Sequence, residues 1–390
     1  MVRLYRTAMS IVENAGVTPS REGKSGPMSL FADTSKPALR SAAPRRSALP
    51  AGDGTLLIIA LGTALVGQAV GVFSGRRTDM GVVTSVLEDL ALLGLLAFAV
   101  VSFILFIDAA RRRSKTPARD ILTTLFGFLF DAARLMQFAR TAAIFILFAI
   151  GFGELKGLAA IGGFAWDESF MHLERWLHFA RLPHEWLRPV YDWPLAVQIV
   201  NFIYNLWYFV IIGVVLAIGI GRGGLENRFR FLFAFMASWL IGGVLIASVF
   251  SSAGPCFYGR LGFGGDYALL MARLGAIDLT HNLYALSTQN MLWESYAGGV
   301  NASPISAFPS LHVATATLIA LFAWPSGWLG RMAGLAFLAT ILFGSVLLGW
   351  HYAVDGYAGI LIALCAWKVA GFVSARLHID NDQGLVRGDR

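Results

Sequence analysis

The stretch GWHYAVDGYAG, residues 349–359, places a histidine and a carboxylate at a spacing that suits covalent catalysis. His351 and Asp355 are four residues apart, so on a helix they share one face, and the carboxylate can accept a hydrogen bond from one imidazole nitrogen. This bond fixes the tautomer and leaves the other nitrogen with a free lone pair, as in an oriented nucleophile. A His–Asp pair that only stabilises an interface has the same spacing, so this pattern alone is not specific.

The stretch FPSLHVATA, residues 308–316, offers a complementary half of such a site. Pro309 and Ser310 favour the start of a helix, and the free backbone N–H groups after them can bind an anion with support from the helix dipole. A phosphate oxygen bound there would lie beside His312. A capped helix with an interfacial histidine is the alternative, but the presence of both stretches favours a functional site.

The elements that carry these residues are predicted to be membrane helices. The 390 residues are 56% hydrophobic and only 14% charged, with a mean hydropathy of +0.64, which is too apolar for a soluble globular protein. In so apolar a chain, the net charge of +7 indicates cytoplasmic loops and contact with lipid headgroups, and we expect no nucleic acid partner. Composition therefore predicts an all-α, multi-pass membrane protein whose partner is the lipid bilayer.

Apolar stretches divide the chain into four regions. Residues 1–53 form a basic arm that we expect to be disordered and cytoplasmic, 54–135 hold two additional spans and a basic linker, 136–374 form a six-helix core, and 375–390 form a cytoplasmic tail. A span needs about 20 residues. Eight candidates are predicted, at residues 54–73, 84–108, 136–161, 195–219, 229–251, 308–324, 331–350 and 354–374. The third is imperfect, because GFGELKG brings Glu154 and Lys156 near its end.

Alternation of the spans assigns sides to the loops. Most of the 31 Lys and Arg residues fall on the side of the N-terminal arm, so the positive-inside rule makes that side cytoplasmic. Three segments then face outward together: residues 162–194, 252–307 and 349–355. His312 lies at the start of the sixth span and His351 just before the eighth, so both are expected at the same depth in the membrane. The first of these segments has apolar and aromatic residues at helical spacing and predicts a helix along the outer interface.

The two histidine stretches resemble a known family. FPSLHVA followed by GWHYAVDGYAG is similar to the second and third motifs of the type 2 phosphatidic acid phosphatase superfamily, and in detail to its inositol phosphorylceramide synthase branch. The resemblance covers about residues 140–374. It implies a membrane lipid substrate, in which His351 attacks the phosphorus of a lipid phosphate ester to form a phosphohistidine and Asp355 orients it. His312 protonates the departing oxygen and then activates the acceptor, and no metal or other cofactor is expected.

The chain departs from the phosphatase branch at the residues that hold phosphate. Gly344 and Ser345 stand where that branch has a Ser-Arg pair, and the outer loop GPCFYGRLG has a single arginine and no Lys-x6-Arg-Pro pattern. Arg260 is the candidate phosphate clamp beside Ser310, because a guanidinium can bind two phosphate oxygens at once. Arg273 is the alternative, and a solvated loop arginine is an equally good interpretation.

Two observations favour transfer to an alcohol over hydrolysis. Few cations are available for a phosphomonoester with nearly two negative charges, whereas a phosphodiester carries one. The loop 252–307 is also long enough to cover an acceptor and exclude water. We therefore expect a phosphotransferase that moves a phospho-head group, inositol phosphate-like, to a hydroxyl acceptor. The alternative is a lipid phosphate phosphatase acting on phosphatidic acid or a polyprenyl phosphate.

Overall fold

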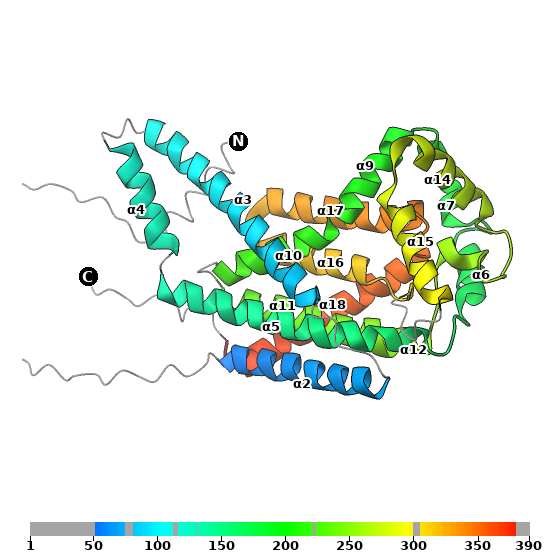
Figure 1. Ribbon diagram of the computed structural model, residues 1–390, viewed down its shortest axis with the longest axis horizontal. Coiled ribbons are helices and arrows are strands. Elements are labelled where there is room, and N and C mark those ends of the chain that lie inside the picture. The colour runs from blue at the N-terminus through cyan, green and yellow to red at the C-terminus, as the bar shows by residue number, and fades with distance from the viewer. Residues whose placement is uncertain are drawn as a thin grey trace, which may run out of the picture.

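The computed structural model describes residues 51–74, 81–111, 116–129, 131–220, 224–298 and 305–379. Across these ranges the chain forms α-helices with short 3-10 and π segments and no β-strand (Figure 1), which confirms the predicted all-α class. The predicted arm up to residue 50 and the tail from residue 380 lie outside the described residues.

Long apolar helices make up most of the structure. Their bounds are α2 (Ala51–Phe73), α3 (Gly81–Arg111), α5 (Ala132–Lys156), α9 (Pro194–Asn205), α10 (Trp207–Ile220), α11 (Leu225–Leu240) with the π-helix η2 (Ile241–Ile246) and α12 (Ala247–Val249), α16 (Leu311–Ala323), α17 (Gly327–Leu347) and α18 (Ala353–Arg376). Within the described ranges, six helical stretches are long and apolar enough to cross a membrane; α3 is not among the six, and α16 and α17 together form one of them. The chain is therefore an integral, multi-pass membrane protein, and the number of eight spans stays a prediction.

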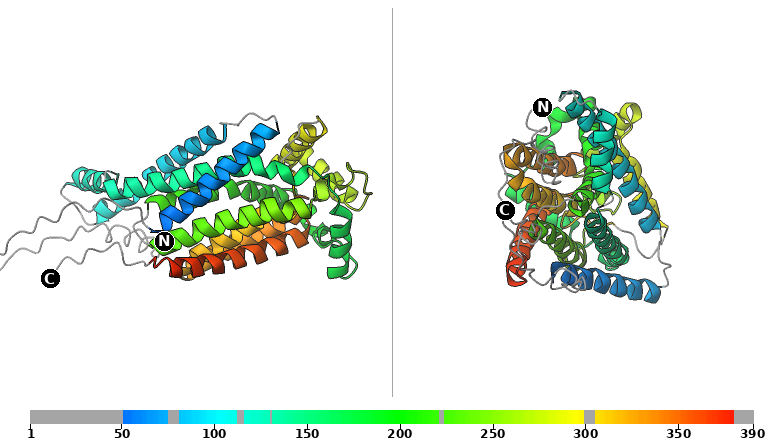
Figure 2. Two further views of the ribbon diagram at one scale, coloured as in Figure 1. Left: turned by 90° about the horizontal axis from the view of Figure 1, so that it is seen from below. Right: turned by 90° about the vertical axis from the view of Figure 1, so that its left-hand side faces the viewer.

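The core of the bundle is formed by the C-terminal helices. α16 packs against α17 and α18, α18 packs against α11, and α10 packs against α5. The end-on view in Figure 2 shows these helices gathered side by side, with α2 and α3 at the periphery. α2 contacts mainly α5, and α3 contacts α10 and α5. The two N-terminal helices thus pack at separate places on the periphery of the bundle, and each adds buried apolar residues to its core.

Close packing and one buried ion pair attach α2 to the bundle. A side chain at Gly67 would meet the backbone of Gly151 in α5, since a Cβ atom there would lie 2.3 Å from the Gly151 oxygen. Small residues of this kind allow membrane helices to approach closely. At the N-terminal end of α2, the buried carboxylate of Asp53 accepts a hydrogen bond from Arg228, at the start of α11, and lies 3.4 Å from Arg140. α2 is therefore fixed at its end as well as along its length.

Short helices form a cap over one end of the bundle, at the right of Figure 1. They are α6 (Asp167–Leu177), α7 (Pro183–Trp186), α8 (Arg188–Tyr191), α13 (Pro255–Tyr258), α14 (Ala268–His281) and α15 (Tyr284–Ala297). α6 matches the helix expected from the pattern of residues 162–194. The segment 252–307 was expected as a loop and instead contains α13, α14 and α15, and the basic linker contains α4 (Pro117–Leu129). In these four helices, glycine and polar residues interrupt the short apolar runs. The helical spacing of apolar residues is therefore hard to recognise in the sequence.

Candidate active site

His351 lies in the turn between α17 and α18, at the capped end of the bundle. Its Nδ1 atom is 2.8 Å from the carbonyl oxygen of Ala307 and 3.3 Å from Oδ2 of Asp355. A carbonyl oxygen can only accept, so the neutral ring must carry its proton on Nδ1 and donate it. The Nε2 atom then keeps a lone pair, which is the arrangement that a histidine nucleophile requires.

Asp355 lies in the first turn of α18, where it has two structural roles besides its contact with His351. Its Oδ2 atom accepts the backbone N–H of Tyr352 at 3.0 Å, which caps the helix. Its backbone carbonyl accepts the N–H of Ser310 at 3.0 Å, which joins the starts of α18 and α16. The Asp355 Oδ1 atom is buried and has no hydrogen-bond partner in the described part of the chain. The predicted His–Asp contact is therefore present, but the nearer partner of the imidazole is a backbone oxygen.

Ser310 is the N-cap of α16, as its position after a proline predicted. It is fully buried, and its hydroxyl accepts the backbone N–H of Val313 at 3.3 Å. A Cβ atom at Gly359 in α18 would lie 2.5 Å from the Ser310 carbonyl oxygen, so only glycine allows α18 to approach α16 this closely. The hydroxyl of Ser310 is engaged in this cap, and its role as a phosphate ligand stays a prediction.

His312 lies in the first turn of α16, beside two aromatic side chains. The centroid of its ring is 4.1 Å from that of Trp207 and 5.0 Å from that of Tyr204, and Trp207 Nε1 donates to the His312 carbonyl oxygen at 3.1 Å. The rings of His312 and His351 have their centroids 5.7 Å apart. Two histidines distant in the sequence thus face one space, as the helical hairpin between them predicted.

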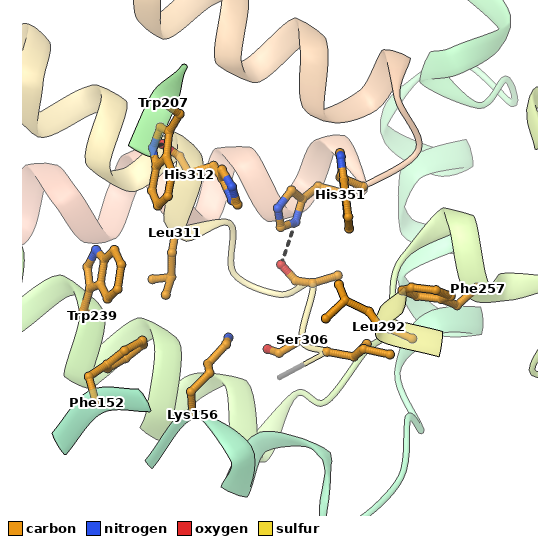
Figure 3. Close-up of a pocket in the computed structure, with 14 residues that line it drawn as sticks. Phe152, Lys156, Trp207, Trp239, Phe257, Leu292, Ser306, Leu311, His312 and His351 are labelled. Atoms are coloured by element: carbon orange, nitrogen blue, oxygen red, sulfur yellow. Dashed lines mark hydrogen bonds between the residues drawn. The ribbon is translucent and has the colours of Figure 1, made fainter. Parts of the chain in front are cut away.

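That space is a cavity of about 230 Å³ at the end of the bundle (Figure 3). Its wall is mostly apolar and aromatic, with a few polar groups, and consists of Phe152, Lys156, Trp207, Trp239, Ala253, Phe257, Leu292, Ile305, Ser306, Ala307, Leu311, His312, Trp350 and His351. Such a composition suits a ligand with a small charged part and an apolar remainder. Both histidines are therefore available to one lipid-like ligand.

Burial sets the charge of the histidine in the turn. It lowers the pKa of His351 to about 4; the hydrogen bond to the carbonyl of Ala307 opposes this effect, and the positive charge of Lys156 adds to it. At neutral pH the ring is therefore uncharged. A neutral imidazole with its proton on Nδ1 is the form that can attack an electrophile through Nε2.

The cations of the outer segments are placed differently from the expectation. Arg260 does not line the cavity; its guanidinium donates to Asn290 Oδ1 at 2.6 Å and lies over the ring of Trp293. Arg273 lies over the ring of Tyr191 and lines a separate, smaller cavity. The structure therefore does not bring either arginine together with the two histidines, and their role as a phosphate clamp stays a prediction.

Lys156 is the cation that does line the cavity, although in the sequence it is visible only as an imperfection in a span. It ends α5, is half-buried, and is the only Lys or Arg among the described residues of the cavity wall. The signal that could have identified it is a lysine at the outer end of an apolar helix, at the depth expected for His312. Ala307, by contrast, acts through its backbone and has no signal in the sequence.

Two buried carboxylates of α6 hold the segments around the site. Asp167 accepts the backbone N–H groups of Ala253 and Gly254 and the hydroxyl of Tyr352, each at 2.8 Å. Burial raises its pKa above the ordinary value. These bonds fix the start of the long outer segment against the turn that carries His351, so α6 positions the site without lining it.

Glu174, two turns further along α6, binds the start of α18. It accepts the backbone N–H of Ala353 and, at 3.0 Å, the hydroxyl of Tyr267. Burial raises the pKa of this carboxyl group to about 8, and the charge of Asp355 acts in the same direction. The sequence carries no sign of either role, because a charged residue on an interfacial helix is ordinarily solvated.

Two histidines of the outer helical region, His178 and His184, lie in different surroundings. His178 is bonded to the carbonyl oxygen of Glu174 and to the hydroxyl of Tyr357, whereas His184 stacks against Tyr267. Across the described ranges, no group of three or more His, Cys, Asp or Glu side chains is arranged to hold a metal ion. The expectation of a reaction without metal or other cofactor stays a prediction.

Comparison with known proteins places this geometry in a family. No curated protein and no solved structure matches the chain. A family model, described as the PAP2 superfamily, matches residues 168–369. This range contains the helices α16 to α18 up to residue 369 and both histidine motifs, and it is more than half of the chain. The members of this superfamily are typically phosphatases or phosphotransferases that act on phosphate esters. With its two histidines facing one cavity at the end of a helical bundle, this chain belongs to the PAP2 superfamily.

Proposed function

We propose that this protein is a lipid phosphotransferase that works through a phosphohistidine at His351, with a phosphodiester lipid as donor and a hydroxyl compound as acceptor. The observation that carries the proposal is the state of His351, on the wall of a cavity that also contains His312: its Nδ1 donates to the Ala307 carbonyl, and its Nε2 has no hydrogen-bond partner among the described residues. This is the geometry of a nucleophile paired with a proton carrier.

The first half-reaction forms a phosphorus–nitrogen bond. The Nε2 lone pair of His351 attacks phosphorus, the ester bond to the lipid alcohol breaks, and His312 gives a proton to the departing oxygen. Asp355 and the Ala307 carbonyl stabilise the positive charge that develops on the attacking ring, because both accept from its Nδ1–H. The product is a neutral diacylglycerol-like alcohol, which can leave into the bilayer.

The second half-reaction reverses these roles. The acceptor hydroxyl gives its proton to His312 while its oxygen attacks phosphorus, and the bond to Nε2 breaks, so that His351 regains its lone pair. The mainly apolar wall of the cavity supports a lipid alcohol as acceptor, since water is poorly held among Phe152, Trp239 and Leu311. The donor head group that we propose is inositol phosphate-like, as in the inositol phosphorylceramide synthase branch.

The membrane orientation is part of the proposal. Because the basic loops fall on the side of the chain termini, we propose that the cap and the cavity face the extracytoplasmic side of the cell or inner membrane. The donor and acceptor would then both be lipids of the outer leaflet.

A competition assay tests transfer against hydrolysis. Purified protein in a neutral glycoside detergent is incubated with phosphatidic acid and with phosphatidylinositol, each labelled on phosphorus, with and without ceramide or a long-chain alcohol. We expect the label to appear on the acceptor from phosphatidylinositol, and only slow release of inorganic phosphate from phosphatidic acid. Rapid phosphate release without any labelled acceptor would identify a lipid phosphatase instead.

A further inference from the structure

We propose that Lys156, with the hydroxyl of Ser306 beside it, is the site that holds the substrate phosphate, and that this pair selects a phosphodiester monoanion. The inference deepens the proposed function and rests on it. It places the phosphate-binding charge on α5, outside the residues 168–369 that the family model matches.

The amino group of Lys156 faces the two histidines. In Figure 3 it points into the cavity, across from His312 and His351, and its charge acts on both rings. A lysine at a helix end in a membrane ordinarily extends toward the headgroups and water. The amino group of Lys156 makes no hydrogen bond or ion pair with any residue in the described part of the chain. An unpaired cation at this depth is costly to keep, which favours a ligand of opposite charge.

Ser306 provides the second, independent observation. Its Oγ atom is buried and has no hydrogen-bond partner among the described residues, although it lines the cavity. Figure 3 shows it on the same side of the cavity as Lys156. The next residue is Ala307, whose carbonyl oxygen holds His351. One extended segment therefore orients the nucleophile and presents an unused hydroxyl to the same space, where a phosphate oxygen would satisfy it.

The charge balance of the cavity points to the class of substrate. His351 is uncharged at neutral pH, and Arg260 is engaged with Asn290, so Lys156 is the only Lys or Arg of the described cavity wall that can balance a bound phosphate. The proton of His312 leaves with the departing alcohol and does not hold the phosphate. A phosphodiester carries one negative charge and is neutralised by one cation. A phosphomonoester carries nearly two, because its second pKa is about 6, and one charge would stay uncompensated in an apolar space.

Protection of Lys156 from chemical modification tests the site without turnover. The full chain in dodecyl maltoside is treated with formaldehyde and cyanoborohydride, and methylation of each lysine is measured by mass spectrometry. Lys368, exposed on α18, is the internal control. We expect didodecyl phosphate to slow methylation of Lys156 at least about tenfold and to leave Lys368 unchanged, with no protection by the uncharged tridodecyl phosphate. Equal methylation of Lys156 with and without didodecyl phosphate would overturn the inference.

The monoester comparison tests the charge argument in the same experiment. At pH 8 monododecyl phosphate is a dianion, and we expect it to protect Lys156 more weakly than the diester does. At pH 5.5 it is mostly a monoanion, and its protection should approach that of the diester. Tighter protection by the monoester at pH 8 than at pH 5.5 would contradict selection of a monoanion.

Substitutions separate charge from packing. Lys156→Met removes the charge and keeps the length of the side chain, and we expect about a 10- to 100-fold loss in kcat/KM, mostly through KM, whereas Lys156→Arg should recover part of it. Ser306→Ala should lower kcat/KM by about 2- to 10-fold, and Lys368→Met should keep the kcat/KM of the wild type. Wild-type kcat/KM in Lys156→Met would rule out the site.

Failure of the site and failure of the proposed function give different results. If didodecyl phosphate protects Lys156 but no lipid phosphate is turned over, the phosphate site stands and the proposed function fails. If transfer proceeds while Lys156 is unprotected and Lys156→Met keeps the wild-type kcat/KM, the proposed function stands and the site fails.

Discussion

The Nδ1 atom of His351 lies 2.8 Å from the carbonyl oxygen of Ala307, a residue 44 positions earlier in the chain. This contact is shorter than the 3.3 Å between the same nitrogen and Asp355. The imidazole is therefore oriented by the polypeptide backbone as well as by a carboxylate. A backbone oxygen cannot be protonated at any pH of interest, so this part of the orientation does not depend on pH.

The first prediction is that phosphate becomes attached to Nε2 of His351. His351→Ala should remove essentially all turnover, because no other described group offers a free imidazole lone pair opposite His312. Mass spectrometry of protein quenched at alkaline pH should detect the phosphohistidine, and phosphorus NMR should identify the Nε2 isomer. His378→Ala, at an exposed position after α18, is the matched control and should stay active. Near-normal turnover by His351→Ala would refute the mechanism.

The second prediction concerns Asp355. Asp355→Asn should fold and should lose about 10- to 1,000-fold in kcat, because the Ala307 carbonyl still fixes the tautomer while the negative charge behind the ring is gone. Asp355→Ala also removes the cap on the N–H of Tyr352 and should lower stability by about 0.5–2 kcal/mol. Steady-state kinetics and thermal unfolding in detergent measure the two effects. An inactive and unfolded Asp355→Asn protein would show that the carboxylate is mainly structural.

The third prediction is a pH dependence that originates at Glu174. Burial raises the pKa of Glu174 to about 8, so the folded protein holds this proton more tightly than the unfolded chain does. Its stabilising contribution is therefore complete at acid pH and is lost as the pH rises through about 8. This difference in pKa between the folded and unfolded chain corresponds to a change in the free energy of unfolding on the order of 3–5 kcal/mol.

Thermal unfolding between pH 5 and 9 measures this dependence. Tm of the wild type should fall toward alkaline pH, and Glu174→Gln, which resembles the protonated acid, should show a smaller fall. Glu168→Gln, at an exposed position on the same helix, should leave the profile unchanged. Identical profiles for Glu174→Gln and the wild type would mean that Glu174 does not titrate in this range.

The fourth prediction is the orientation in the membrane. Single cysteines are introduced at Leu279, exposed in α14 of the cap, or at His378, exposed after α18, in a chain whose own Cys256 and Cys365 are replaced. An impermeant thiol reagent should label the first cysteine in intact cells and the second only after permeabilisation. The reverse pattern would place the cavity on the cytoplasmic side.

Much of the site could be predicted because its parts are encoded as local patterns. The helix start at Ser310 follows from a proline and a serine before an apolar run, and a helical hairpin of membrane length brings His312 back to the depth of His351. The contact between His351 and Asp355 follows from a spacing of four residues at a helix start. These relationships need no knowledge of side-chain packing.

The remaining parts depend on long-range packing and left little trace in the sequence. Ala307 contributes a backbone oxygen, which every residue has. Lys156 was visible as a charge in a span, but the direction of its side chain is determined by how α5 packs in the bundle. Arg260 was visible as the only arginine of the stretch GPCFYGRLG, yet its position is determined by α15, whose residue Asn290 binds it.

The ion pair between Asp53 and Arg228 has a consequence for biosynthesis, since the two residues are 175 positions apart. At about 5–20 residues per second, a ribosome needs roughly 9–35 s to synthesise the chain between them. During that interval the carboxylate at the start of α2 has to remain hydrated at the membrane surface or to pair with Arg140 alone. α2 can therefore reach its final position only after the translocon has released α11, so the first of the described helices to be made is among the last to dock.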